Sequence, residues 1–252
     1  MDDHIKIDRE GRVITLTLQR EEKKNALTQA MYAAMADALE SYAEDDEARA
    51  FVITGAGDMF TAGNDLYDFA KGDRETEVPP VWRFLAAIRE CPKPVIAAVN
   101  GHGIGIGLTM LLHCDLVYAS TSATLSVPFV QLGLVPEAAS STLLPAAVGM
   151  AIANDMLLAG RVITAEEAER FGLVARVFED AQLSGEVAKI AAAVAAMAPK
   201  AMVLSKALIR DNREAVAAKM AEEAKHFAAQ LQGPEFAESV AAKMQKRAPN
   251  YG

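Results

Sequence analysis

The sequence has very little cysteine, few aromatic residues and no long hydrophobic run. Its 252 residues include two cysteines, too few for the disulfide framework of a small secreted domain. The longest apolar run, from Ile190 to Ala198, is far shorter than the roughly 20 residues that a membrane-spanning helix needs. The first residues also lack the apolar segment that signal peptides carry. We therefore expect a cytoplasmic protein without a membrane span.

The sequence also has few positively charged residues and no clustered metal ligands. Lysine and arginine together number 25 against 34 aspartates and glutamates, which gives a formal net charge of −9. An acidic surface repels polyanions, so we expect no nucleic-acid partner. The four histidines are scattered along the chain, and neither they nor the cysteines have the spacing of metal ligands. We therefore expect no metal site.

Apolar residues are abundant, at 52% of the chain, and a chain of this size buries about 70% of its surface. Short apolar runs predict buried strands, and apolar residues three or four positions apart predict helices. The strands are expected at 4–8 and 12–18, which form a hairpin, and at 50–54, 95–99, 115–119 and near 173–178. Helices are expected over 27–42, with Asn25 or Thr28 as the cap, at 78–91 and from 199 to 244. This alternation predicts an α/β protein with a helical appendage at its end.

Two glycine-rich loops follow predicted buried strands. Residues 101–107 hold four glycines, and residues 55–66 form a second loop rich in glycine and aspartate. Glycine lets the backbone turn tightly and approach a ligand, and the helix that follows the first loop begins with free N–H groups that attract negative charge. Each loop alone fits a tight crossover or a surface turn equally well. Together, at strand ends where α/β proteins bind ligands, they predict a site built from backbone donors.

Glu137 is the best candidate for acid–base chemistry. Leucine, valine and proline precede it, and small alanines and serines follow it. Apolar surroundings disfavour the charged carboxylate and raise its pKa, which suits the group to proton transfer. The alternative is a structural glutamate at a helix N-terminus, with Ser140 or Ser141 as the helix cap.

Several segments carry a resemblance to a known family. They are NAL at 25–27, FTAGNDL at 60–66, KPVIAAVNGHGIGIG at 93–107, CDLVYAS at 114–120 and LGLVPEAASS at 132–141. In this order they resemble the enoyl-CoA hydratase/isomerase family, the crotonase superfamily, and GNDL with PEAASS looks most like its Δ3,Δ2-enoyl-CoA isomerase branch. The resemblance implies a crotonase-like α/β spiral of ββα units in residues 1–195, which carry the acyl-CoA site. It also implies a helical region, residues 196–252, that forms homotrimers or dimers of trimers.

The resemblance also implies a substrate and its binding residues. The substrate is an acyl-CoA thioester, with coenzyme A as part of the substrate and no separate cofactor. The backbone N–H groups of Asn64 and Ile106 match an oxyanion hole. The positions that match the CoA and substrate contacts are Ala26, Ala62, Asp65, Leu66 and Gly105, with Lys24 as a local cation for the CoA phosphates. The segment 67–90, with Phe69, Trp82 and Phe84, is expected to shape the acyl pocket.

Departures from the family pattern indicate the reaction. Hydratases of this family carry two glutamates, and the matching positions here hold Thr109 and Phe129. Glu137, in contrast, matches the single catalytic glutamate of the isomerase branch. The resemblance therefore implies isomerisation of 3-enoyl-CoA to 2-trans-enoyl-CoA, with Glu137 as the proton shuttle. The alternatives are hydration or another crotonase-type reaction on an acyl-CoA, and a non-catalytic acyl-CoA-binding protein.

Overall fold

The larger of two β-sheets forms the centre of the molecule. The computed structural model describes residues 2–65, 67–68 and 78–252. The larger sheet has the strand order β1-β2-β3-β5-β7-β10, in which only β1 and β2 pair antiparallel. Its strands are β1 (Ile5–Glu10), β2 (Val13–Leu18), β3 (Ala50–Gly55), β5 (Val95–Val99), β7 (Leu116–Ser120) and β10 (Arg176–Phe178). The expected N-terminal hairpin and the expected buried strands are therefore confirmed.

A second, smaller sheet continues the strands of the first. It has the order β4-β6-β8-β9, with β4 (Met59–Thr61), β6 (His102–Ile104), β8 (Thr124–Ser126) and β9 (Ile163–Thr164). Each of β4, β6 and β8 directly follows a strand of the larger sheet, and a helix comes after each pair. This repeated strand–strand–helix unit is the spiral of ββα units that the sequence predicts, and the fold class is confirmed.

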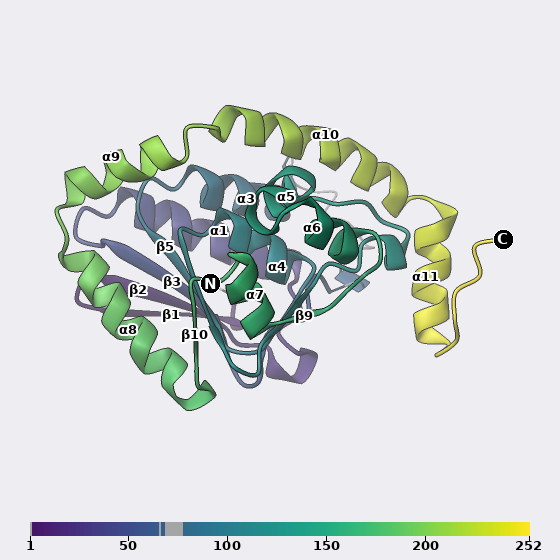
Figure 1. The fold of residues 1–252 in the computed structure, drawn as a ribbon, viewed down its shortest axis with the longest axis horizontal. Coiled ribbons are helices and arrows are strands. Elements are labelled where there is room, and N and C mark those ends of the chain that lie inside the picture. Colours follow the sequence, from purple (N-terminus) through teal and green to yellow (C-terminus); the bar gives the residue numbers. More distant parts are fainter. Residues whose placement is uncertain (1, 66, 69–77) are drawn as a thin grey trace.

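Helices cover both faces of the larger sheet, which explains its apolar strands. Phe51 and Ile53 of β3 belong to the main core with α1 (Gln29–Glu44) and α3 (Pro80–Glu90). Ala50 and Val52, which alternate with them, pack against α8 (Asp180–Ala196) on the other face (Figure 1). The shorter helices are η1 (Glu21–Lys23), α4 (Ile106–Thr109), η2 (Met110–His113), η3 (Val130–Leu132), α5 (Ser140–Val148), α6 (Met150–Leu157) and α7 (Ala165–Phe171).

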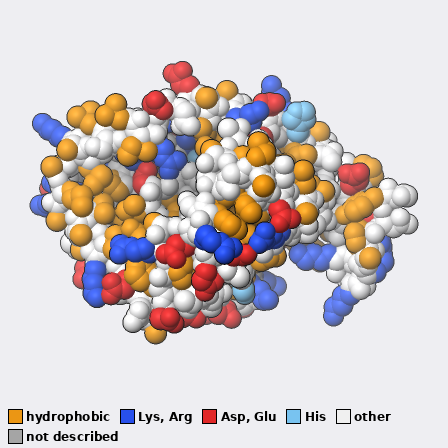
Figure 2. Space-filling view, viewed as in Figure 1, with side chains coloured by type: hydrophobic (Ala, Val, Ile, Leu, Met, Phe, Trp, Pro, Cys, Tyr) orange, Lys and Arg blue, Asp and Glu red, His pale blue; other side chains and the backbone are white. Residues whose placement is uncertain are grey.

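The C-terminal part of the chain is helical, as the sequence predicts. It forms α9 (Pro199–Ile209), α10 (Arg213–Leu231) and α11 (Pro234–Met244), which run along one side of the molecule (Figure 1). α10 contributes Val216, Met220 and Phe227 to the main core. α9 exposes Leu204 and Leu208, and Figure 2 shows hydrophobic side chains gathered on the side where α8 and α9 lie. The tail is therefore partly core and partly open apolar surface.

One bent pair of helices has the length and composition of a membrane-spanning segment. Within the described residues, no single helix is long and apolar enough to cross a membrane. The pair is α8 and α9, and the two helices are bent by 106° where they meet.

Candidate active site

A cavity of about 410 Å³ brings the two glycine-rich loops and Glu137 together. Ala62, Gly63 and Asn64 line it from the loop after β4. Gly105 and Ile106 line it from the start of α4, and Glu137 lines it from the loop before α5. α10 and α11 close the cavity with the apolar side chains Phe227, Leu231 and Phe236 and with the cation Lys243.

The first loop is held in place by its backbone. Gly63 has a φ of +88°, and a Cβ there would lie 2.9 Å from the carbonyl oxygen of Ile104, so only glycine fits. The Gly63 carbonyl accepts from the Leu27 N–H at 2.8 Å, and the Asp65 N–H donates to the Leu27 carbonyl at 2.8 Å. Between these bonds, the side-chain oxygen of Asn64 accepts a hydrogen bond of 2.5 Å from the hydroxyl of Tyr32. Asn64 is therefore fixed by both its neighbours and its side chain.

The second loop turns the chain from β6 into α4. Gly105 has a φ of +59°, and its N–H donates to Ser126 of the neighbouring strand β8 at 2.9 Å. Its carbonyl accepts from the N–H groups of Leu108 and Thr109. None of these bonds uses the N–H of Ile106, the first residue of α4, which lines the cavity.

Two backbone donors at the cavity have no acceptor. Within the part of the chain that the structure describes, the N–H groups of Asn64 and Ile106 make no hydrogen bond. Both residues line the same cavity, on loops from neighbouring ββα units. Two preorganised N–H groups can stabilise a thioester carbonyl oxygen when it becomes an enolate oxygen.

Glu137 lines the same cavity and is buried. Its side chain is 6% exposed, and its Oε1 accepts a hydrogen bond of 2.6 Å from the Thr109 hydroxyl. Burial raises the pKa of Glu137 to about 7, the hydrogen bond from Thr109 opposes that rise, and the negative charge of Glu223 adds to it. A carboxyl group with a pKa near the working pH can both accept and return a proton.

The loop that carries Glu137 has an unusual backbone. Ala138 and Ala139 follow it with φ values of +56° and +57°, a left-handed conformation that costs an alanine about 1–2 kcal/mol. The Ala138 carbonyl accepts a hydrogen bond of 2.8 Å from Nε2 of the buried His113. Burial lowers the pKa of His113 to about 4, so its ring is neutral at pH 7. The N-cap of α5 is Ala139, so the serine cap that belongs to the alternative interpretation of Glu137 is wrong.

The other predicted binding residues fall into two groups, those that line the cavity and those outside its lining. Ala62 and Gly105 line the cavity, whereas Lys24, Ala26 and Asp65 are outside its lining. Lys24 is exposed, and its carbonyl accepts from the Ala62 N–H at 2.9 Å. Nη1 of Arg20 donates to both the Ala26 carbonyl and the Asp65 carboxylate, at 2.9 and 2.8 Å. Leu66 lies outside the described residues.

Two of the expected acyl-pocket residues lie elsewhere. Phe84 is fully buried in the core, with its ring centroid 5.6 Å from that of Tyr32, and it does not line the cavity. Trp82 packs on the core and is also outside the lining. Phe69 is not among the described residues. The apolar lining comes instead from α10, α11 and the segment before Glu137, which contributes Phe129, Leu132 and Leu134.

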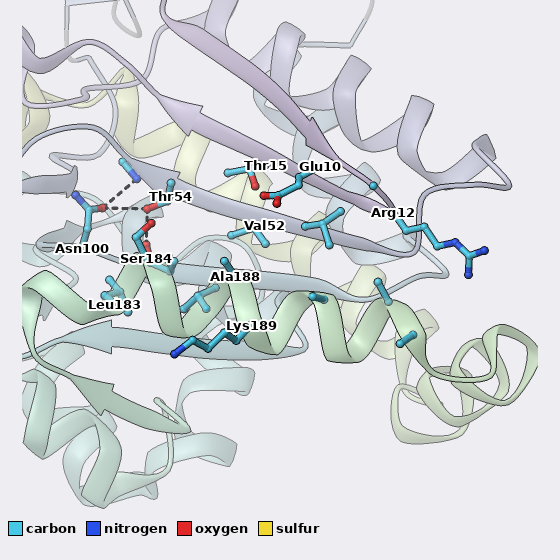
Figure 3. Close-up of a pocket in the computed structure, with 18 of the residues that line it drawn as sticks. Glu10, Arg12, Thr15, Val52, Thr54, Asn100, Leu183, Ser184, Ala188 and Lys189 are labelled. Carbon is cyan, nitrogen blue, oxygen red and sulfur yellow. Dashed lines mark hydrogen bonds between the residues drawn. The ribbon is translucent and has the colours of Figure 1, made fainter.

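A larger cavity, of about 930 Å³, lies between α8 and the other face of the main sheet (Figure 3). Thr15, Val52 and Thr54 line it from the strands, and Ser184 and Ala188 line it from α8. Its acidic lining residues, Glu10 and Asp180, are exposed. The described residues that line it include no predicted site residue and no buried acid–base group, so the chemistry belongs to the smaller cavity. Among the described residues, no cluster of His, Cys, Asp and Glu could hold a metal ion.

Three contributors to the site were not predicted from sequence: Tyr32, His113 and Glu223. One of them carries a visible signal. Glu223 lies on the buried stripe of α10 with Val216, Met220 and Phe227, at spacings of three and four residues. A glutamate at such a position is unusual because a buried charge needs specific partners.

Comparison with known proteins shows which family the chain belongs to. The model of the family described as "Enoyl-CoA hydratase/isomerase" matches residues 8–252. The chain therefore belongs to the enoyl-CoA hydratase/isomerase family and is an enzyme of that family, which confirms the resemblance read from its motifs.

Individual relatives include both hydratases and isomerases. The chain is 34% identical over 250 residues to 2,3-dehydroadipyl-CoA hydratase of Escherichia coli K12, with 97% of each chain covered. It is 40% identical over 216 residues to enoyl-CoA delta isomerase 2 of Rattus norvegicus, covering 83% of this chain and 55% of the rat protein. A solved structure of an enoyl-CoA hydratase/isomerase from Pseudoalteromonas atlantica T6c matches with a TM-score of 0.97 and 54% identity, covering 99% and 100% of the two chains.

Proposed function

We propose that this enzyme isomerises 3-enoyl-CoA thioesters to 2-trans-enoyl-CoA thioesters. The observation that carries the proposal is that Glu137 is the sole carboxylate among the described residues that line the cavity. An allylic shift needs one group that removes a proton and returns it elsewhere, and Glu137 has the burial and pKa for both steps.

The mechanism follows from the placement of Glu137 and the two backbone donors. The ionised carboxylate removes a proton from C2, and the electron pair moves into the thioester to form a dienolate. The N–H groups of Asn64 and Ile106 hold the enolate oxygen, and such donors contribute about 3 kcal/mol each to the transition state. Glu137 then returns the proton to C4, and the double bond forms between C2 and C3.

The described residues that line the cavity include no second acid, which supports isomerisation over hydration. Water addition requires one group that orients and deprotonates water and another that serves the α-carbon. Thr109 and Phe129 occupy the positions of the family's two hydratase glutamates. Thr109 donates to Glu137, and Phe129 packs edge-on against Phe227 with ring centroids 6.5 Å apart. Neither side chain can deprotonate water.

The coenzyme A part of the substrate is proposed to bind along the rim formed by residues 24–27 and 62–65. Their backbones are joined by the hydrogen bonds of Ala62, Leu27 and Asp65. Lys24 is exposed there and can meet the CoA phosphates. No further cofactor is needed for this reaction.

The test is a panel of 3-enoyl-CoA and 2-enoyl-CoA thioesters followed spectroscopically. Wild-type protein should convert 3-hexenoyl-CoA to 2-hexenoyl-CoA, and Glu137→Gln should lower kcat by about 10²–10⁴-fold. Calorimetry of the variant should show that it still binds the thioester. Unchanged turnover in Glu137→Gln would sink the assignment of Glu137.

Hydration is the second candidate, because the match to the Escherichia coli hydratase extends over nearly the whole of both chains. The same panel separates the two reactions. Formation of a 3-hydroxyacyl-CoA from crotonyl-CoA, without any shift of 3-hexenoyl-CoA, would favour the hydratase.

We also propose that the protein assembles into trimers or dimers of trimers. Leu204, Leu208 and Ile209 of α9 are 65%, 78% and 77% exposed, which is unusual for three large apolar side chains on one helix. Replacement of Leu204 and Leu208 by aspartate should yield monomers in light scattering at concentrations where the wild type is a trimer.

A further inference from the structure

Glu223 is a buried carboxylate that forms no ion pair with another described residue. It lies on α10 and is 6% exposed, whereas its neighbour Glu222 is largely exposed and pairs with Lys219 at 2.6 Å. All the hydrogen bonds it accepts from the described residues come from Ala139 and Ser141. One oxygen accepts from the Ala139 N–H at 2.6 Å, and the other accepts from the N–H of Ser141 at 3.0 Å and from its hydroxyl.

These donors form the turn that directly follows Glu137. Ala139 is the N-cap of the nine-residue helix α5 and has no capping side chain of its own, so Glu223 provides the cap from another helix. On the other side of the turn, His113 donates to the Ala138 carbonyl. The two left-handed alanines are therefore fixed by one acceptor and one donor, and Glu137 is the residue immediately before them.

We propose that Glu223 is a positioning residue for the proton shuttle. Because it accepts hydrogen bonds from Ala139 and Ser141, it fixes the turn that sets the direction in which Glu137 enters the cavity. The proposal rests on the proposed role of Glu137. Glu223 does not line the cavity, so it acts through the backbone of the turn. The same helix supplies Phe227 and Leu231 to the cavity wall, which couples the docking of α10 to the placement of the base.

The charge of Glu223 also acts on Glu137. The other groups that face Glu137 are the hydroxyls of Thr109 and Tyr32, the neutral ring of His113 beyond Ala138, and Lys243 across the cavity. The negative charge of Glu223 raises the pKa of Glu137, after the larger effect of burial. Removal of that charge should therefore lower the pKa of Glu137.

The experiment compares Glu223→Gln and Glu223→Asp, with Glu222→Gln as the matched control on the same helix. Glutamine has one acceptor oxygen instead of two, so the turn loses part of its anchor. We expect Glu223→Gln to lower kcat for 3-hexenoyl-CoA about 10- to 100-fold with little change in KM, because a misplaced base slows proton transfer. The midpoint of its kcat/KM profile should move to lower pH.

Glu223→Asp separates the two effects. It keeps the charge but shortens the side chain, so kcat should fall while the pH midpoint stays near that of the wild type. Ser141→Ala removes one donor without changing any charge, and it should lower kcat severalfold; it replaces the Glu223 variants if they do not fold. A Glu223→Gln enzyme, or in its place a Ser141→Ala enzyme, with the kcat and pH midpoint of Glu222→Gln would overturn the proposal.

A second readout keeps this test separate from the proposed reaction. The pH dependence of the difference in unfolding free energy between each protein and its Glu137→Gln derivative reports the pKa of Glu137 without any substrate. If the wild type does not isomerise enoyl-CoA but this pKa still falls in Glu223→Gln, the proposed function fails and the coupling of Glu223 to Glu137 stands. If isomerisation is found and neither kcat nor this pKa changes, the positioning role fails alone.

Discussion

Thr109 donates a hydrogen bond of 2.6 Å to Glu137 from a helix 28 residues earlier in the chain. A glutamate at position 109 would place a second carboxylate beside the first, and one of the two would then have to stay protonated. A hydroxyl instead donates to the ionised form of Glu137 and stabilises it. The pair thus supports a site in which one carboxylate changes its protonation state.

Thr109→Val should move the activity profile to higher pH. The valine keeps the shape of threonine but cannot donate, and the Thr109 hydrogen bond holds the pKa of Glu137 down against burial. Activity at pH 6 should therefore fall more than activity at pH 9, and stability should fall by about 1–3 kcal/mol. Thr54→Val, which removes a hydroxyl bonded to the Ala98 carbonyl outside this cavity, is the control. A pH profile unchanged from wild type would contradict the assigned role of Thr109.

Glu137→Gln should make the protein more stable at high pH. Burial raises the pKa of Glu137 from its ordinary 4.5 to about 7 in the folded protein. The stability contributed by the protonated carboxyl is fully present below pH 4.5 and is lost as the pH rises through 7. Glutamine cannot ionise. The unfolding free energy of the variant minus that of the wild type should therefore be about 3 kcal/mol larger at pH 8 than at pH 4. Denaturant unfolding at both pH values measures this, and an equal difference at the two would refute it.

Tyr32→Phe should slow catalysis as well as destabilise the fold. The lost hydroxyl donates to the side chain of Asn64, whose N–H lies at the cavity, and the deletion should cost about 1 kcal/mol of stability. Tyr42→Phe is matched to it, because Tyr42 is equally buried and donates to the Pro94 carbonyl at 2.9 Å in the core. We expect similar losses of stability but a severalfold lower kcat only in Tyr32→Phe. Equal kcat in both variants would show that the tyrosine does not position Asn64.

Gly105→Ala should separate backbone strain from lost catalysis. Gly105 and Gly149 both have positive φ, at +59° and +80°, and a Cβ at either would meet no atom within 4 Å. Alanine at either position should therefore cost about 1–3 kcal/mol through strain alone. Gly105→Ala should in addition lower kcat about 100-fold by shifting the Ile106 N–H. Steady-state kinetics beside thermal unfolding check this, and full activity in Gly105→Ala would argue against an oxyanion hole at Ile106.

The parts of the fold that sequence predicts are those with a local cause. Buried parallel strands such as Val95–Val99 are continuous apolar runs. Residue type and position offer Asn25 or Thr28 as the cap of α1, and the structure shows Thr28, whose hydroxyl accepts from the Met31 N–H at 3.2 Å. The strands of the smaller sheet have two or three residues, too few for a period to be detected.

The site residues likewise divide into those with a local sequence signal and those without one. The glycine-rich loops and Glu137 lie in short segments with a distinct composition, and they do meet at one cavity. Local sequence points to Ser140 or Ser141 as the cap of α5, whereas the side chain that accepts from the Ala139 N–H lies 84 residues further along the chain. Partners such as Tyr32, His113 and Glu223 are set by the way helices cross, which no local pattern contains.

α10 and α11 form one wall of the cavity, and Glu223 of α10 holds the turn after Glu137. During synthesis on a ribosome, the sheets and the glycine-rich loops emerge before these helices do. A nascent chain that holds both sheets but not yet α10 therefore lacks part of its core and the hydrogen bonds from the turn after Glu137 to Glu223. The placement of Glu137 would then be completed only after α10 has been synthesised and has packed on the core.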